Sequence, residues 1–223
     1  MSRALENGAG AVLVSAHLGE LEAAASWLTG VAGREIVAVV DSVSPWWRQL
    51  FFDRVRRACG VRLRRQAEVQ VEDLVADLAG GRIVLLMLDR RCRSRTVSTW
   101  FMSRRVDLPA AAWELSVRTG APVLTGTTVR SADGGCVLRF GAPWEAVNNR
   151  HLGPADLIQA LATELEYEIR QAPSQWHIPA DPAHLPPRSL SSSFPRSPSR
   201  GSHQPEAGIE AMSSRPFSAL AVR

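Results

Sequence analysis

The chain has 223 residues, of which 45% are hydrophobic, and this length and composition are typical of one globular domain with a packed core. Its formal net charge is +4 and all 26 basic residues are arginine, which favours anionic partners. The three cysteines, Cys59, Cys92 and Cys136, lack the spacing of a disulfide framework or a zinc site, which indicates a reducing compartment. No stretch approaches the roughly 18 apolar residues of a membrane-spanning helix, and the N-terminal residues do not read as a signal peptide.

Short apolar runs alternate with longer helical patterns, which predicts an α/β fold with a mixed, largely parallel sheet flanked by helices. The continuous run IVLLML is typical of a strand that is covered on both faces. The predicted strands cover residues 11–16, 35–40, 61–64, 83–88, 97–101, 122–129 and 136–140. The predicted helices cover residues 20–29, 45–59, 70–79, 110–119 and 154–171.

The composition changes after Arg170, where proline, serine and arginine come to dominate. Such a segment cannot bury enough apolar surface to offset its ordering entropy. The sequence therefore predicts one folded domain over residues 1–178 and a disordered tail over residues 179–223.

The first predicted strand ends at a histidine, in the stretch AVLVSAHLGELE. His17 follows that strand, at the edge of an open α/β sheet where ligands gather, and Glu22 lies in the first turn of the next helix. A carboxylate on one ring nitrogen leaves the other free to take a proton from a hydroxyl, so the pair suits general-base catalysis. A structural interpretation stays open, in which His17 caps a loop and Glu22 is a solvated carboxylate at the positive end of a helix.

Five blocks in collinear order resemble the lysophospholipid acyltransferase superfamily, in the branch of the lipid A late acyltransferases and the phosphatidylinositol mannoside acyltransferases. The first block resembles the family's HxxxxD/E motif. The blocks are GAVLVSAHLGELE, FFDRVRRACGVRL, IVLLMLDRRCRSRTVSTWFMSRRVDLP, AWELSVRTGAPVL and LEYEIRQAPSQWH.

The resemblance implies transfer of a fatty acyl group from an acyl thioester, acyl-CoA or acyl-ACP, to a hydroxyl of a glycolipid or lysolipid. His17 would be the general base and Glu22 its orienting partner. Arg56, Asp89 and Arg90 would contact anionic parts of the substrates, although solvated surface arginines are an equal interpretation. Neither a metal nor a bound cofactor is implied.

The chain departs from the family pattern in two places. Met102, Ala111, Ala112 and Trp113 stand where small residues or a turn are expected, and Trp113 is predicted to reshape the acyl pocket. Only 16 residues precede His17, so we expect a domain without the family's N-terminal helical segment. A late start assignment, a fragment of a longer product and a branch without the anchor all remain open, and the apolar surface so exposed would suit a homodimer interface.

Basic clusters interleave with aromatic residues, most of which we expect in the core: Trp46, Trp47, Phe51, Phe52, Trp100 and Phe101. The alternative is that these clusters hold the protein on an anionic membrane surface. For the protein as a whole, we predict peripheral contact with the cytoplasmic face of the membrane. Two further functions remain open. One is an inactive, acyltransferase-like lipid-binding protein. The other is a nucleotide- or nucleic-acid-binding module, disfavoured because Gly8 and Gly10 precede the first strand; we predict no nucleic-acid partner.

Overall fold

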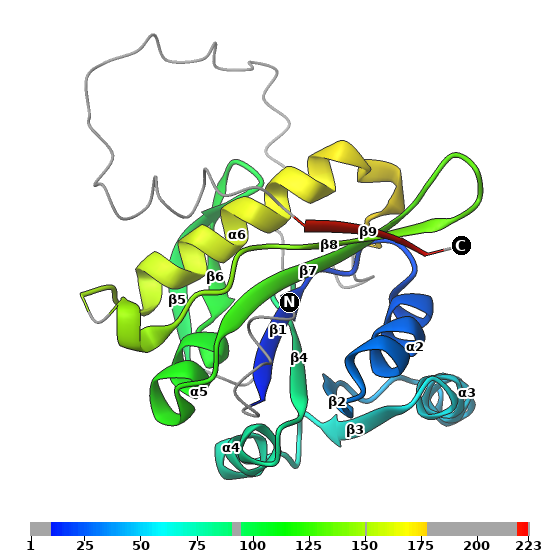
Figure 1. The fold of residues 1–223 in the computed structure, drawn as a ribbon, viewed down its shortest axis with the longest axis horizontal. Coiled ribbons are helices and arrows are strands. Elements are labelled where there is room, and N and C mark those ends of the chain that lie inside the picture. Colours follow the sequence, from blue (N-terminus) through cyan, green and yellow to red (C-terminus); the bar gives the residue numbers. More distant parts are fainter. Residues whose placement is uncertain (1–9, 91–94, 150, 178–217, 223) are drawn as a thin grey trace, which may run out of the picture.

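The computed structural model describes residues 10–90, 95–149, 151–177 and 218–222. A seven-stranded sheet of order β3-β2-β4-β1-β7-β8-β9 forms its centre (Figure 1). The strands from β3 to β7 pair in parallel, whereas β8 and β9 are added antiparallel. The predicted class, an α/β fold with a mixed and largely parallel sheet, is confirmed.

The elements of the central sheet are β1 (Ala11–Ser15), β2 (Ile36–Val40), β3 (Val61–Arg65), β4 (Ile83–Met87), β7 (Val123–Arg130), β8 (Cys136–Phe140) and β9 (Ser218–Val222). The helices are α2 (Leu21–Ala32), α3 (Trp46–Ala58), α4 (Val71–Ala79), α5 (Ala111–Thr119) and α6 (Pro154–Gln171). Two short 3-10 turns, Ala146–Asn148 and Pro173–Gln175, flank α6. The bounds of the predicted elements lie within three residues of the predicted ones, whereas β9 and the two 3-10 turns were not predicted.

The central strands are buried on both faces because helices cover each side of the sheet, as Figure 1 shows for α6 and α2. Val12 and Val14 of β1 belong to a core cluster shared with α4, α5 and α6. Ala11 and Leu13 point the other way, into a cluster with Leu28 of α2. Full burial of each valine or leucine contributes about 1.5–3 kcal/mol, so both faces of β1 stabilise the fold.

A separate hairpin joins β5 (Thr96–Phe101) to β6 (Arg104–Pro109), and β6 was not predicted. Met102 and Ser103 occupy its two-residue turn with φ of 51° and 63°, in the left-handed region that favours glycine. Helix α6 holds the hairpin: the Trp100 N–H donates to Gln159 Oε1 at 2.8 Å, and the Met102 N–H donates to Glu166 Oε2 at 2.7 Å. These two bonds to α6 compensate for a weakly apolar strand sequence.

Two expectations concern the ends of the chain: a missing N-terminal helical segment and a disordered C-terminal tail. Residues 1–9, on which the expectation of a missing N-terminal helical segment depends, lie outside the described part, as do residues 91–94 and 178–217. Ser218–Val222, predicted to be disordered, instead form β9 and pair with β8. Within the described ranges, no helix combines the length and apolar character needed to cross a bilayer.

Candidate active site

His17 and Asp89 meet at the carboxyl edge of the parallel strands. Ser15 of β1 and Met87 of β4 are partners in the parallel ladder, and the Leu88 N–H continues it by donating to the Ser15 carbonyl at 2.8 Å. His17 and Asp89 each lie two residues beyond these partners. Two chains that leave the sheet in the same register therefore bring an imidazole and a carboxylate side by side.

Asp89 is the carboxylate that holds the histidine ring. His17 Nδ1 lies 2.8 Å from Asp89 Oδ1, and the His17 backbone N–H donates to Asp89 Oδ2 at 2.8 Å. The Asp89 side chain is 0% exposed, whereas the His17 side chain stays partly accessible. An ionised carboxylate only accepts hydrogen bonds, so this contact favours the ring tautomer that carries its proton on Nδ1 and leaves Nε2 as the acceptor.

Trp176 completes the environment of Asp89. Its indole Nε1–H donates to Asp89 Oδ2 at 2.9 Å, and its ring packs edge-on against Phe101. The residues around it clamp the histidine turn: the Gly19 N–H donates to the Gln175 carbonyl at 2.9 Å, and the His177 N–H donates to the His17 carbonyl at 2.7 Å. The segment after α6 therefore fixes both members of the pair.

Gly19 has a structural reason to be glycine. Its φ is +65°, and a Cβ at this position would lie 2.2 Å from the Thr128 carbonyl oxygen of β7. Gly19 therefore forms a tight turn, and the backbone that it approaches is that of β7.

Glu22 is not placed on the imidazole, in contrast to the prediction. It lies in the first turn of α2, with Oε1 3.4 Å from Nε of Arg56 on α3, and its side chain is 36% exposed. Glu22, His17 and Arg56 all line the same cavity. The predicted site residues therefore share one site, but Asp89, expected to contact substrate, contacts the His17 imidazole, and Glu22 pairs with Arg56.

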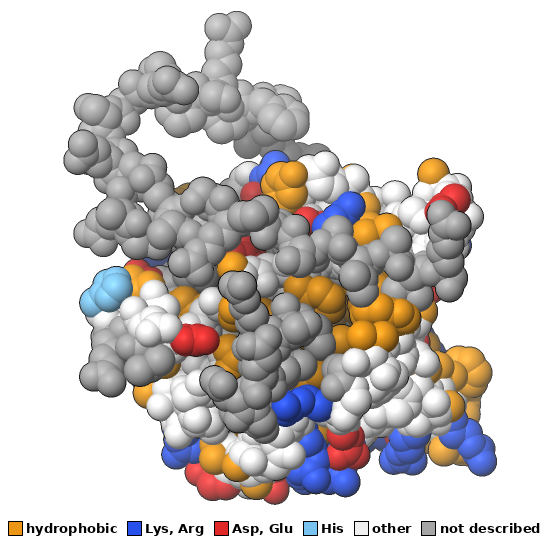
Figure 2. All heavy atoms as spheres, viewed as in Figure 1, with side chains coloured by type: hydrophobic (Ala, Val, Ile, Leu, Met, Phe, Trp, Pro, Cys, Tyr) orange, Lys and Arg blue, Asp and Glu red, His pale blue; other side chains and the backbone are white. Residues whose placement is uncertain are grey.

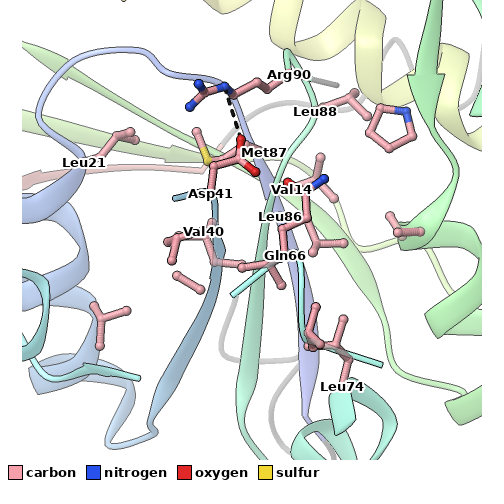
Figure 3. A pocket seen from close by; sticks show the side chains of 18 of the residues that line it. Val14, Leu21, Val40, Asp41, Gln66, Leu74, Leu86, Met87, Leu88 and Arg90 are labelled. Carbon is pink, nitrogen blue, oxygen red and sulfur yellow. Dashed lines mark ion pairs between the residues drawn. The ribbon is translucent and has the colours of Figure 1, made fainter. Parts of the chain in front are cut away.

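Arg90 follows directly after Asp89 and turns toward β2. Its Nε lies 3.6 Å from Asp41 Oδ2, and both residues line the cavity (Figure 3). Both side chains are only partly buried, so this ion pair is weak. The Arg90 guanidinium therefore remains available to an incoming anion.

A cavity of about 420 Å³ opens beside His17, within the size range of small-molecule sites. Figure 3 shows Arg90 and Asp41 at one end and Leu74 at the other, with Val14, Val40 and Leu86 between them. Its walls are mostly aliphatic, and they come from the sheet, α2, α3, α4 and α5. The cavity thus joins a polar end, beside the histidine, to an apolar interior.

Helix α5 contributes Ala111, Ala112 and Glu114 to this cavity. Trp113, predicted to reshape the acyl pocket, instead packs half-buried against the core cluster. One turn of α5 points alanines into the cavity, and Trp113 is not among the residues that line it.

Sequence reasoning missed two roles. Asp89 was not assigned to His17, although both residues directly follow predicted strands, at 11–16 and 83–88, and a parallel register brings such positions together. Trp176 was part of the quoted closing block but carried no role, because nothing local to it indicates a partner 87 positions away in the sequence.

The fold and the site define an α/β protein with a carboxylate-oriented histidine at the mouth of an apolar cavity. A family model described as bacterial lipid A biosynthesis acyltransferase matches residues 1–178, and the chain belongs to that family. It is accordingly an acyltransferase of the lipid type. A comparison with curated proteins gives no match.

Proposed function

We propose that the protein transfers a fatty acyl group from acyl-CoA or acyl-ACP to a hydroxyl of a glycolipid or lysolipid, with His17 as general base. The observation that carries the proposal is the 2.8 Å contact of His17 Nδ1 with a fully buried Asp89, beside an apolar cavity. Asp89 takes the orienting role that the HxxxxE motif gave to Glu22. No resident cofactor takes part in this proposal.

The reaction needs no nucleophile from the protein. His17 Nε2 accepts the proton of the acceptor hydroxyl, whose oxygen attacks the thioester carbonyl carbon. The tetrahedral intermediate collapses, the C–S bond breaks, and the thiolate takes the proton back from His17. An ester and a free thiol result, while Asp89 stabilises the imidazolium that forms in between.

The cavity suits the acyl chain. Its aliphatic walls offer a hydrocarbon tail the same gain that buries core side chains, about 0.8 kcal/mol for each CH₂ group. The polar end, beside His17, is where the thioester carbon must lie for attack. The acyl chain then extends from the histidine toward Leu74 (Figure 3).

Arg56 and Arg90 both line this cavity and supply positive charge to it. Guanidinium groups pair well with phosphate, which both acyl donors and a phosphatidylinositol mannoside acceptor carry. Glu22 holds Arg56 from one side, so the pair acts in substrate binding and not in proton transfer. Because acyl-CoA and acyl-ACP are cytoplasmic and the acceptor is a membrane lipid, we place the reaction at the cytoplasmic face of the membrane.

The test is a turnover assay on the purified chain with labelled palmitoyl-CoA or palmitoyl-ACP and a panel of glycolipids and lysolipids, reading both ester formation and thiol release. We expect turnover that falls about 10²–10⁴-fold in His17→Ala. A matched control is His151→Ala, at an exposed position away from the cavity. Acyl-chain binding with no turnover in the unaltered chain would instead support the inactive lipid-binding alternative.

A further inference from the structure

Helix α3 carries an apolar face that the described part of the protein leaves uncovered. Trp46 and Trp47 are 76% and 58% exposed, and Leu50 and Phe51 are exposed beside them. We call these four residues the α3 aromatic face. The expectation that most of the aromatic residues lie in the core is wrong here, since Trp46, Trp47, Phe51 and also Trp100 are exposed.

The helix is attached to the body through polar side chains. Asp53 is buried and accepts a hydrogen bond from Arg65 of β3, and Gln49 accepts one from the Val43 N–H at 3.2 Å. Arg56 turns inward to Glu22. This is the reverse of an ordinary surface helix, whose apolar stripe faces the core, and the outward apolar stripe calls for a partner.

The charge around the face identifies that partner. Arg48, Arg54 and Arg57 are exposed on the same helix and form no ion pair with residues that the structure describes. The single acid of α3, Asp53, is neutralised by Arg65. Figure 2 shows hydrophobic side chains next to basic ones at the edge of the molecule where Figure 1 places α3. Exposed tryptophan flanked by arginine is the composition of helices that lie in an anionic lipid interface.

Helix α3 adjoins the candidate active site at both of its ends. The turn before α3 contributes Asp41 and Val43 to the cavity, and Arg56 and Cys59 at the other end of the helix line the same cavity. We propose that α3 lies on the surface of an anionic bilayer, with its aromatic face at headgroup level, and so holds the protein and its cavity at the lipid surface. The benefit to catalysis depends on the function proposed above, whereas the binding itself does not.

The experiment measures binding of the full chain to vesicles of phosphatidylcholine mixed with phosphatidylglycerol, and to vesicles of phosphatidylcholine alone, by flotation and tryptophan fluorescence. We expect the unaltered chain to prefer the mixed vesicles. Trp46→Ser combined with Trp47→Ser should weaken binding to both vesicles about 10- to 100-fold. Arg48→Gln, Arg54→Gln and Arg57→Gln together should weaken binding to the mixed vesicles by roughly 100-fold and leave binding to pure phosphatidylcholine unchanged.

The matched control is Val117→Ser combined with Tyr167→Ser, which removes exposed apolar side chains from α5 and α6 and should not alter vesicle binding. Equal vesicle binding by the double tryptophan variant and the unaltered chain overturns the proposal. A second result also overturns it: the unaltered chain does not bind vesicles and sediments as a dimer, and the double tryptophan variant sediments as a monomer. The α3 aromatic face is then an interface between two copies of the chain.

Turnover with detergent-solubilised substrates separates this proposal from the proposed function. A docking role predicts that the double tryptophan variant keeps the unaltered rate in detergent and loses rate only on vesicles. If the unaltered chain binds vesicles but turns over no substrate in either assay, the proposed function fails and the docking surface stands.

Discussion

The two carboxylates beside the candidate active site differ in nearly every physical respect. Asp89 is 0% exposed and accepts hydrogen bonds from the His17 backbone, the His17 ring and Trp176. Glu22 is 36% exposed and makes one loose ion pair with Arg56. A buried carboxylate with three donors is rigid and strongly coupled to the imidazole, whereas an exposed pair is screened by solvent. The motif-bearing Glu22 is therefore the more weakly held of the two.

The largest expected effect separates these two carboxylates directly. Asp89→Asn should lower kcat about 10²–10⁴-fold, because an amide can present its N–H to Nδ1 and so favour the tautomer in which Nε2 carries the proton. Glu22→Gln should lower kcat/KM by no more than about 10-fold, as expected for an exposed pair. Steady-state kinetics of both variants checks this, and a reversed ranking would return the orienting role to Glu22.

The next effect tests Trp176 as the positioning residue of Asp89. Trp176→Phe removes one hydrogen bond to a buried charge, worth about 1.5–3 kcal/mol, so kcat should fall about 10- to 100-fold while KM for the donor stays unchanged. The control is Trp144→Phe, since the buried Trp144 Nε1 has no hydrogen-bond partner among the described residues. Equal losses in the two variants would show that only indole packing matters.

A smaller effect concerns Arg56. Arg56→Gln should raise KM for a phosphate-bearing donor by about 10-fold and leave kcat unchanged, because a charge-assisted hydrogen bond is lost and the proton-transfer pair is intact. Exposed Arg105 of β6, which does not line the cavity, provides the control as Arg105→Gln. A fall in kcat for Arg56→Gln would contradict the division between the two carboxylates.

The smallest effect concerns a third carboxylate, Glu164 of α6, which accepts a hydrogen bond from Thr125 at 2.6 Å. Burial raises the pKa of Glu164 above its ordinary value of 4.5, and the Thr125 hydroxyl only partly opposes that rise. Between pH 4.5 and the raised pKa of Glu164 in the folded protein, the Glu164 carboxyl is ionised in the unfolded chain but still protonated in the folded one. The free energy of unfolding therefore falls as pH rises through this range.

Glu164→Gln removes that titration. We expect the variant to lose less stability than the unaltered chain as pH rises above 4.5, and to be the more stable of the two at neutral pH. Denaturant unfolding at a series of pH values measures the difference. Glu68→Gln, at an exposed position, is the control and should follow the unaltered chain. A Glu164→Gln curve parallel to the unaltered one would contradict the prediction.

Local pattern predicted most of the fold. Apolar runs such as IVLLML and amphipathic segments such as α6 set their own element type, because burial of both strand faces or one helix face dominates their energetics. β6 escaped prediction because its sequence RRVDLP is only half apolar, and bonds from β5 and α6 stabilise the hairpin. β9 escaped for a different reason: its sequence SALAV is mostly apolar, but it lies in a segment whose overall composition predicted disorder, and its pairing with β8 is a tertiary contact.

The sequence by itself determined the class of fold, the position of His17 at a strand end and the family blocks that indicate acyl transfer. Only the tertiary structure decided which acid contacts the imidazole of that histidine. The parallel register of β1 and β4 brings Asp89, which lies 72 positions further along the chain, to the His17 ring. The tertiary structure also decided which aromatic residues face outward, because Asp53 and Arg56, not the tryptophans, attach α3 to the body. Spacing along one helix is a local property, whereas pairing between strands is set by the packing of the whole sheet.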